Sequence, residues 1–316
     1  AGCSSDWSWD CFMSAIPSGP TPTQPTRILG AGHASSCPAA PQLWGTQRTA
    51  MVLNLQGSSN VELACMEITD RSSCVEHHCA GGVCPGEVNR CNRDSFPWGD
   101  WAATGIKAVD SARVLMRDIN VHGMANRGVS AGRLSDWTTE RLTIRANGWA
   151  GWDGDIGSNS SNSGEIIFRQ LELSWNGCGE RYPGGQPYGC WAQTAGGYGD
   201  GLGTAETAGH WIIEESLIHH NTSDGIDLLY MSSAGRVTVR RSWFEGNAGN
   251  QLKTKGSSLI ENSVVVGNCA FFSGRDNMLP GDHCRALGNA VSVSLFPTSE
   301  ANLTNNAIIG QGDCLV

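Results

Sequence analysis

A repeat of short strand-like segments runs through most of this 316-residue chain and constrains its fold more than any other feature. In each segment apolar and polar residues alternate, which is the pattern of a half-buried β-strand. Each segment ends in Asn or Gly, and we expect these residues to supply the left-handed backbone of a tight corner. The segments cover residues 114–123, 142–147, 166–176, 211–221, 237–247 and 259–268.

A second short strand follows each corner, and these second strands can be overlaid on one another. Their shared glycine falls at positions 105, 128, 154, 201 and 225, and Gln251 takes its place in the next strand. The steps are 23–26 residues except for one of 47, which we attribute to a loop insertion at residues 177–199 closed by a Cys178–Cys190 disulfide. A period of about 23–26 residues with two or three short strands is typical of a parallel β-helix.

We therefore predict an all-β fold, a single-domain right-handed parallel β-helix that spans residues 1–316. Residues 1–26 are irregular and contain four prolines. We expect them to form an N-terminal cap, because the first coil would otherwise expose its strand edges. The β-helix coils then occupy residues 27–316, with disulfide-stapled loop insertions at about 71–100 and 177–199.

The 13 cysteines indicate an oxidising compartment. Because their number is odd, at least one is free or pairs outside the chain. The densest group has cysteines at positions 74, 79, 84 and 91, and we interpret it as disulfide-forming rather than as a zinc site. We expect a secreted protein, extracellular or periplasmic, whose signal peptide has already been removed.

Charge and hydropathy exclude two classes of partner. The net charge is −9 and no block of Lys and Arg occurs, so the sequence lacks the basic patch that binds nucleic acid. No apolar run approaches the ~18 residues of a membrane span. We expect a monomer with no nucleic-acid and no membrane partner.

The overlay also predicts which side chains are neighbours, because stacked coils place equivalent residues about 4.8 Å apart. It puts Asp153, Asp200 and Asp224 in one column, and Asp227 and Lys253 in a second column on the same outward face. Ionised carboxylates at that spacing repel each other. A Ca²⁺ ion, which takes about six to eight oxygen ligands, would relieve the repulsion. Two plainer roles stay open for these residues, as Asp-Gly turn formers and as a Lys–Asp ladder pair.

Two segments carry a resemblance to a known family. Asn221-Thr-Ser-Asp-Gly-Ile-Asp-Leu228, followed by Gly249-Asn-Gln-Leu-Lys-Thr-Lys-Gly256, resembles the pectin-lyase-like right-handed parallel β-helix superfamily. Within it, the spacing is most similar to the family 9 polysaccharide (pectate) lyases. The resemblance implies that Asp224 and Asp227 are calcium ligands, with Asp200 as the upstream ligand, and that Lys253 is the base. The family has two consecutive Asp residues where this chain has Ser223-Asp224, so one carboxylate is missing.

The resemblance implies a secreted lyase that cleaves a uronate-containing polysaccharide by calcium-assisted β-elimination. The catalytic candidates are Lys253, Asp224 and Asp227, and the metal-ligand candidates are Asp153, Asp200, Asp224 and Asp227. The substrate-binding candidates are Lys255, His220, Trp152, Tyr230 and Arg275. Two alternatives remain: a glycoside hydrolase that uses paired Asp residues in the same groove, and a non-catalytic carbohydrate-binding solenoid.

Overall fold

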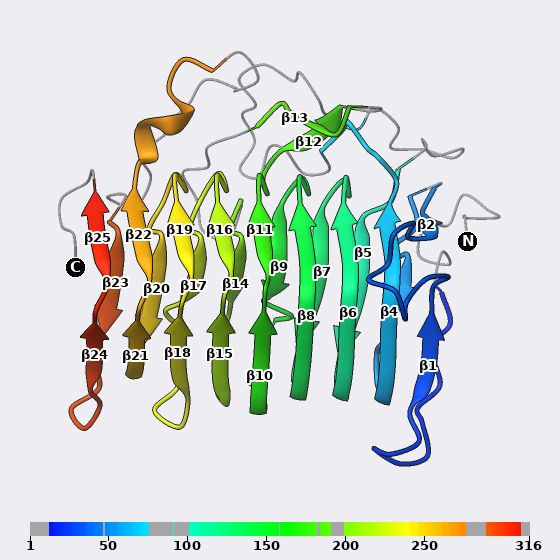
Figure 1. Ribbon diagram of the computed structural model, residues 1–316, viewed down its shortest axis with the longest axis horizontal. Coiled ribbons are helices and arrows are strands. Elements are labelled where there is room, and N and C mark those ends of the chain that lie inside the picture. Colours follow the sequence, from blue (N-terminus) through cyan, green and yellow to red (C-terminus); the bar gives the residue numbers. More distant parts are fainter. Residues whose placement is uncertain are drawn as a thin grey trace.

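The computed structural model is a parallel β-helix in which successive coils stack along one axis (Figure 1). It describes residues 13–46, 48–75, 91, 101–157, 159–181, 184–190, 199–275 and 289–310. The all-β solenoid predicted from the repeat is therefore confirmed. Across these ranges, no helix has the length and apolar character needed to cross a lipid bilayer.

Eight of the described strands form one continuous sheet, which we call the narrow sheet. Its neighbours are all parallel. In spatial order the strands are β3 (Leu53–Asn54), β5 (Thr104–Val109), β7 (Arg127–Gly132), β9 (Ala150–Gly154), β14 (Leu202–Thr204), β17 (Ile226–Leu228), β20 (Leu252–Lys255) and β23 (Val291–Ser294).

The second sheet, which we call the wide sheet, has 15 described strands and folds along a bend. The bend falls at residues with left-handed backbone, such as Asp118 (φ 53°), Arg141 (φ 53°) and Gln170 (φ 54°). Three long strands run through it, namely β4 (Ser59–Thr69), β6 (Ala112–His122) and β8 (Ser135–Arg145). The shorter strands are β1 (Thr26–Leu29), β2 (Gln42–Trp44), β10 (Ser163–Arg169), β11 (Glu172–Ser174), β15 (His210–Glu214), β16 (Leu217–His219), β18 (Arg236–Arg240), β19 (Trp243–Glu245), β21 (Ser257–Glu261), β22 (Val264–Gly267), β24 (Ala301–Thr304) and β25 (Ala307–Gly310).

The corner asparagines do not have the left-handed backbone expected of them. The residue before each one does, and these residues are Ala146, Trp175, His220 and Gly246. The asparagines are fully buried instead, and each side-chain amide donates to the next amide oxygen at 2.8–3.0 Å, on the following coil for three of them and four residues on for Asn247. The ladder runs through Asn147, Asn176, Asn221 and Asn247 and ends on Gln251. Asn is therefore required at these corners for hydrogen bonding rather than for its backbone freedom.

The overlay is wrong by three residues in the coil that contains β9. It equates Gly154 with Gly201, but the structure pairs Trp152 with Leu202 and Asp153 with Gly203. Gly151 is the true equivalent of Gly201. The misplacement follows from counting Asp-Gly pairs, because the aligned coil has Ala150 where the neighbouring coils have Arg127 and Asp200.

This shift makes Trp152 a core residue, so its prediction as a sugar-binding residue is wrong. Its side chain is 1% exposed. The ring packs edge-on against Trp137 and Phe168, with centroid distances of 5.9 and 5.1 Å. A ring enclosed in this way cannot stack on a sugar.

Disulfides staple the loops, as predicted. Cys178–Cys190 closes the insertion after β11, and Cys74–Cys91 and Cys37–Cys65 are also formed. Cys269, in the short 3-10 helix η2 (Cys269–Phe272), is disulfide-bonded as well. Most of the insertion predicted at 71–100, and residues 1–12 of the predicted cap, lie outside the described residues.

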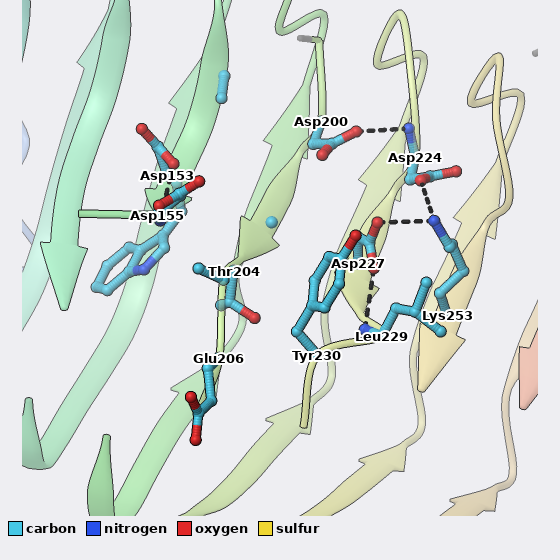
Figure 2. A pocket seen from close by; sticks show the side chains of 14 residues that line it. Asp153, Asp155, Asp200, Thr204, Glu206, Asp224, Asp227, Leu229, Tyr230 and Lys253 are labelled. Atoms are coloured by element: carbon cyan, nitrogen blue, oxygen red, sulfur yellow. Dashed lines mark hydrogen bonds and ion pairs between the residues drawn. The ribbon is translucent and has the colours of Figure 1, made fainter. Parts of the chain in front are cut away.

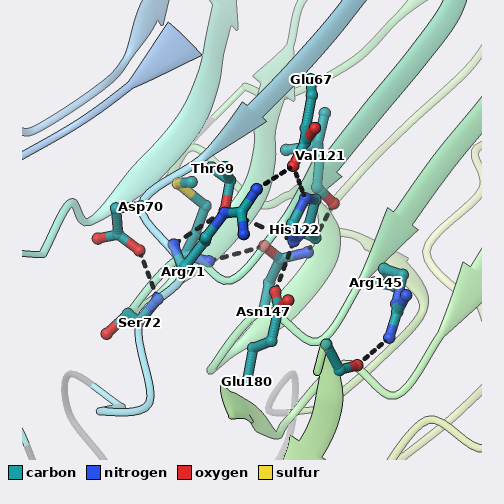
Figure 3. Close-up of polar contacts among 12 residues, drawn as sticks. Glu67, Thr69, Asp70, Arg71, Ser72, Val121, His122, Arg145, Asn147 and Glu180 are labelled. Carbon is teal, nitrogen blue, oxygen red and sulfur yellow. Dashed lines mark hydrogen bonds and ion pairs between the residues drawn. The ribbon is translucent and has the colours of Figure 1, made fainter. Parts of the chain in front are cut away.

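A buried charge cluster fastens the hairpin of the second insertion to the coils (Figure 3). The hairpin consists of β12 (Gly179–Arg181) and β13 (Gln186–Tyr188). The His122 ring lies between two carboxylates, with Nδ1 2.5 Å from Glu180 on the hairpin and Nε2 2.9 Å from Glu67 on β4. Arg145 also donates to the carbonyl oxygen of Gly185. The insertion is thus held beside the corners at which the narrow-sheet strands β14 and β17 begin.

The asparagine ladder generates a test of the stacking. Asn221→Ala removes the side-chain oxygen that accepts from both the backbone N–H and the side-chain amide of Asn176. Because each orphaned polar group costs about 1–3 kcal/mol, we expect the free energy of unfolding to fall by roughly 2–5 kcal/mol. Denaturant unfolding measures it. Asn302→Ala, at an exposed position on β24, is the matched control and should change little. Equal effects of the two substitutions would contradict the ladder's role.

Candidate active site

The predicted catalytic residues meet on the outward face of the narrow sheet, where β14, β17 and β20 adjoin (Figure 2). Alternation along each strand puts Leu202, Ile226 and Leu252 in the core and turns the next residue outward. Asp227 and Lys253 are consequently register partners on adjacent strands. A hollow of about 480 Å³ opens beside them.

Three of the four predicted metal ligands form a tight carboxylate cluster. Asp200, Asp224 and Asp227 each offer an oxygen, and these oxygens lie within 4.8 Å of one another. Backbone amides orient all three side chains, and Asp227 Oδ1 accepts from the Leu229 amide at 3.0 Å. Asp200 Oδ1 accepts from the Asp224 amide at 3.0 Å, and Asp224 Oδ1 accepts from the Asn250 amide at 2.6 Å. The cluster is therefore built into the corners that precede β14 and β17 and into β17 itself.

Lys253 is hydrogen-bonded directly to this cluster. Its Nζ donates to Asp227 Oδ2 at 2.7 Å and to Asp224 Oδ2 at 2.9 Å. Burial alone would lower the pKa of Lys253, but the two carboxylates outweigh burial and raise that pKa above its ordinary value. Burial and the neighbouring Asp224 charge raise the pKa of Asp227, and Lys253 opposes that rise. In this arrangement the lysine is protonated and serves as the counterion of the cluster.

The donor set at the cluster fits a hard divalent cation. Carboxylate oxygens are the ligands that Ca²⁺ prefers. A further oxygen is near, because the Asn250 amide, which donates to Asp224 Oδ1 at 3.0 Å, has a buried Oδ1 with no hydrogen-bond partner among the described residues. Asp200, Asp224, Asp227 and the Asn250 amide oxygen are therefore the groups that could hold such an ion.

Asp153 does not belong to the cluster, although we predicted it as a fourth metal ligand. The three-residue shift moves it from the Asp200–Asp224 column to the column of Gly203 and Asp227. Its carboxylate accepts a hydrogen bond from Arg127 Nε. A carboxylate that already has a guanidinium partner does not need a metal ion to balance its charge.

One of the predicted substrate-binding residues lies at the hollow with its ring accessible. Tyr230 lines it and is 58% exposed. Lys255, His220 and Arg275 are not among the residues that line it. Lys255 Nζ lies 4.9 Å from the centre of the Phe296 ring. His220 and Arg275 both contact Phe271, at 3.8 and 3.6 Å from its ring centre.

Sequence reasoning missed several residues that line the hollow. Thr204 is buried, and its Oγ1 has no hydrogen-bond partner among the residues described. Glu206 and Asp155 are exposed carboxylates at the same hollow. Asp155 gave a signal, because the overlay aligns it with the apolar residues Leu202 and Ile226, and a charged residue at that position marks the register error. Glu206 follows β14 in a turn and matches no motif.

Comparisons with known proteins place the chain by its fold. No family model matches the sequence, and no curated protein matches it. The structure is similar to an alginate lyase from Paenibacillus sp. str. FPU-7, with a TM-score of 0.50 and 14% identity over 95% of this chain and 87% of that chain. It is also similar to the pectate lyase Pel9A, with a TM-score of 0.42 and 12% identity over 99% of this chain and 82% of that one. At this identity, the alginate lyase comparison shows a shared parallel β-helix fold.

The pH dependence of folding stability tests whether the His220 ring is buried in a positively charged environment. Burial, together with the positive charges of His219 and Arg275, lowers its pKa from 6.5 to about 4. The unfolded chain therefore binds a proton more readily than the folded one, so stability falls as the pH drops from about 6.5 toward 4. In His220→Gln this part of the pH slope should disappear, as measured by denaturant unfolding across that range. Identical slopes in the two chains would show that His220 titrates normally.

Proposed function

We propose that this protein is an extracellular polysaccharide lyase that cleaves a uronate polymer by β-elimination. The observation that carries the proposal is a lysine amine hydrogen-bonded to a three-carboxylate cluster at a hollow on the outer face of a β-helix. The fold shared with the alginate lyase supports it. The disulfides support an oxidising location outside the cytoplasm.

The chemistry follows from what a lysine can do beside a bound uronate. Lys253 Nζ takes the proton from C5, the carbon that carries the sugar's carboxylate. The C5–H electron pair forms the C4–C5 double bond, and the C4–O bond breaks. The leaving oxygen keeps the bonding pair and takes up a proton. A calcium ion, when bound, would neutralise the sugar carboxylate and make the C5 proton more acidic.

Lys253 must give up its proton before it can act as a base. The contacts with Asp224 and Asp227 hold that proton on Nζ. Deprotonation therefore requires that another positive charge take the place of Lys253 beside these carboxylates. Tyr230 offers an exposed ring on which a sugar could stack, and Lys255 offers a cation on the same strand as Lys253.

Lys253→Arg separates the lysine's charge from its ability to act as a base. Arginine keeps the positive charge beside the carboxylates but does not deprotonate in proteins. We expect kcat on a polyuronate to fall at least about 100-fold, the usual worth of a general base, with little change in thermal unfolding. Lys253→Met should also lose activity and in addition lose stability, because two buried carboxylates then lack their counterion. Near-normal turnover by Lys253→Arg would exclude Lys253 as the base.

The reaction class is tested on a panel of acidic and neutral polysaccharides, with and without calcium. Unsaturated ends, followed by ultraviolet absorbance, and reducing ends should rise together on a polyuronate. A chelator should abolish both. No product of either kind from any polymer would contradict an enzymatic role and favour a carbohydrate-binding solenoid.

One observation favours a second candidate, a glycoside hydrolase. Six carboxylates line the hollow against one lysine, and burial raises the pKa of Asp227 as a general acid requires. In that case a neutral polymer would be cleaved, and reducing ends would rise without unsaturated ends.

A further inference from the structure

The three lysines of this chain all lie on one face of the molecule. Of its 21 Lys and Arg residues, only Lys107, Lys253 and Lys255 are lysines. Each occupies a partly exposed, outward position between buried neighbours on β5 or β20 of the narrow sheet. The lysines are therefore confined to the sheet face that carries the candidate active site.

Arginines of the wide sheet pair with carboxylates on neighbouring coils, an arrangement that stabilises a sheet. The pairs are Arg27 and Arg117 with Glu62, Arg141 with Asp118, Arg169 and Arg240 with Glu214, and Arg241 with Glu215. Lys107 differs from them. Its Nζ donates to the neutral Ser130 hydroxyl at 3.1 Å, and no carboxylate of the described residues forms an ion pair with it.

Arg127, on the next coil, adds a second cation beside Lys107. Its Nε donates to Asp153, and its guanidinium carbon lies 4.2 Å from the centre of the Trp149 ring. Burial and the repulsion from Arg127 lower the pKa of Lys107, and Asp153 only partly opposes this. Asp153 thus pairs with Arg127 and forms no ion pair with Lys107. The positive charge left over is partly buried, where an unpaired charge is costly unless an anion joins it.

Lys107 is aligned with Lys253 along the axis of the solenoid. The outward column runs through register partners Lys107, Ser130, Asp153, Gly203, Asp227 and Lys253. Its five steps of about 4.8 Å place the two lysines ~24 Å apart. A linear polymer that lies over Lys253 and follows the column would therefore reach Lys107.

We propose that Lys107 and Arg127 form a remote anion-binding site for the carboxylate of a uronate residue several sugars away from the bond that is cleaved. The inference rests on the proposed function, because it requires an acidic polymer. The remote site further predicts that the protein prefers long polymers whose carboxylates are not esterified. The site contributes to binding and takes no part in the chemistry at Lys253.

Calorimetric binding of size-graded oligouronates tests this site without turnover when it is done in a Lys253→Arg background. We expect a gain in affinity once the oligomer is long enough to span the ~24 Å between the lysines, about five or six sugars. Adding Lys107→Met should remove that gain, about tenfold in Kd, and Lys107→Arg should restore it. Arg236→Gln removes one charge from the wide sheet and is the control. Unchanged affinity of Lys107→Met for every length would overturn the proposal.

Mass-spectrometric footprinting with an amine-reactive reagent distinguishes failure of the remote site from failure of the lyase proposal, since the chain has only three lysines to follow. A long oligouronate should protect Lys107, whereas a trimer should not. Protection of Lys253 or Lys255 with Lys107 still reactive would overturn the remote site and leave the lyase proposal standing. If no lysine is protected by any polyuronate, the acidic substrate class itself is wrong. Equal thermal unfolding of Lys107→Met and the unsubstituted chain would exclude a structural cause.

Discussion

In-register stacking of coils is the constraint on which the rest of this structure depends. Parallel strands place equivalent residues about 4.8 Å apart, so each side chain lies beside the equivalent side chain of the next coil. Amides exploit this spacing, and the ladder from Asn147 to Gln251 links each of its buried side-chain amides to the next one. Apolar residues exploit it too, and the core residues Leu202, Ile226 and Leu252 are register partners on successive strands.

The same spacing brings ionised carboxylates close enough to repel each other. Asp200 and Asp224 sit on adjacent coils, and Asp227 joins them within 4.8 Å. Fixed amide hydrogen bonds stop these side chains from turning away. Something positive must compensate, and in this structure it is Lys253. The proposed base role of Lys253 therefore depends on another positive charge replacing it beside Asp224 and Asp227.

The repeat made the fold and most of the catalytic cluster predictable from sequence, because a solenoid converts spacing along the chain into neighbours in space. Asp227 and Lys253 were placed on adjacent strands by counting residues, and the structure pairs them. The error at Asp153 arose because the coil at 150–154 carries Ala150 where the Asp column should continue, while a nearby Asp-Gly pair imitated the motif. Counting could not predict which aromatic rings hold the remaining candidates, namely Phe296 for Lys255 and Phe271 for His220 and Arg275.

The central claim is that Lys253 and its carboxylate cluster carry out an elimination. Mass spectrometry of the products formed from a polyuronate in heavy-oxygen water tests it most directly. Elimination predicts a new non-reducing end that is one water lighter than a saturated sugar, and no heavy oxygen introduced by the cleavage. Saturated products that contain one heavy oxygen for each bond cleaved would show hydrolysis and contradict the account.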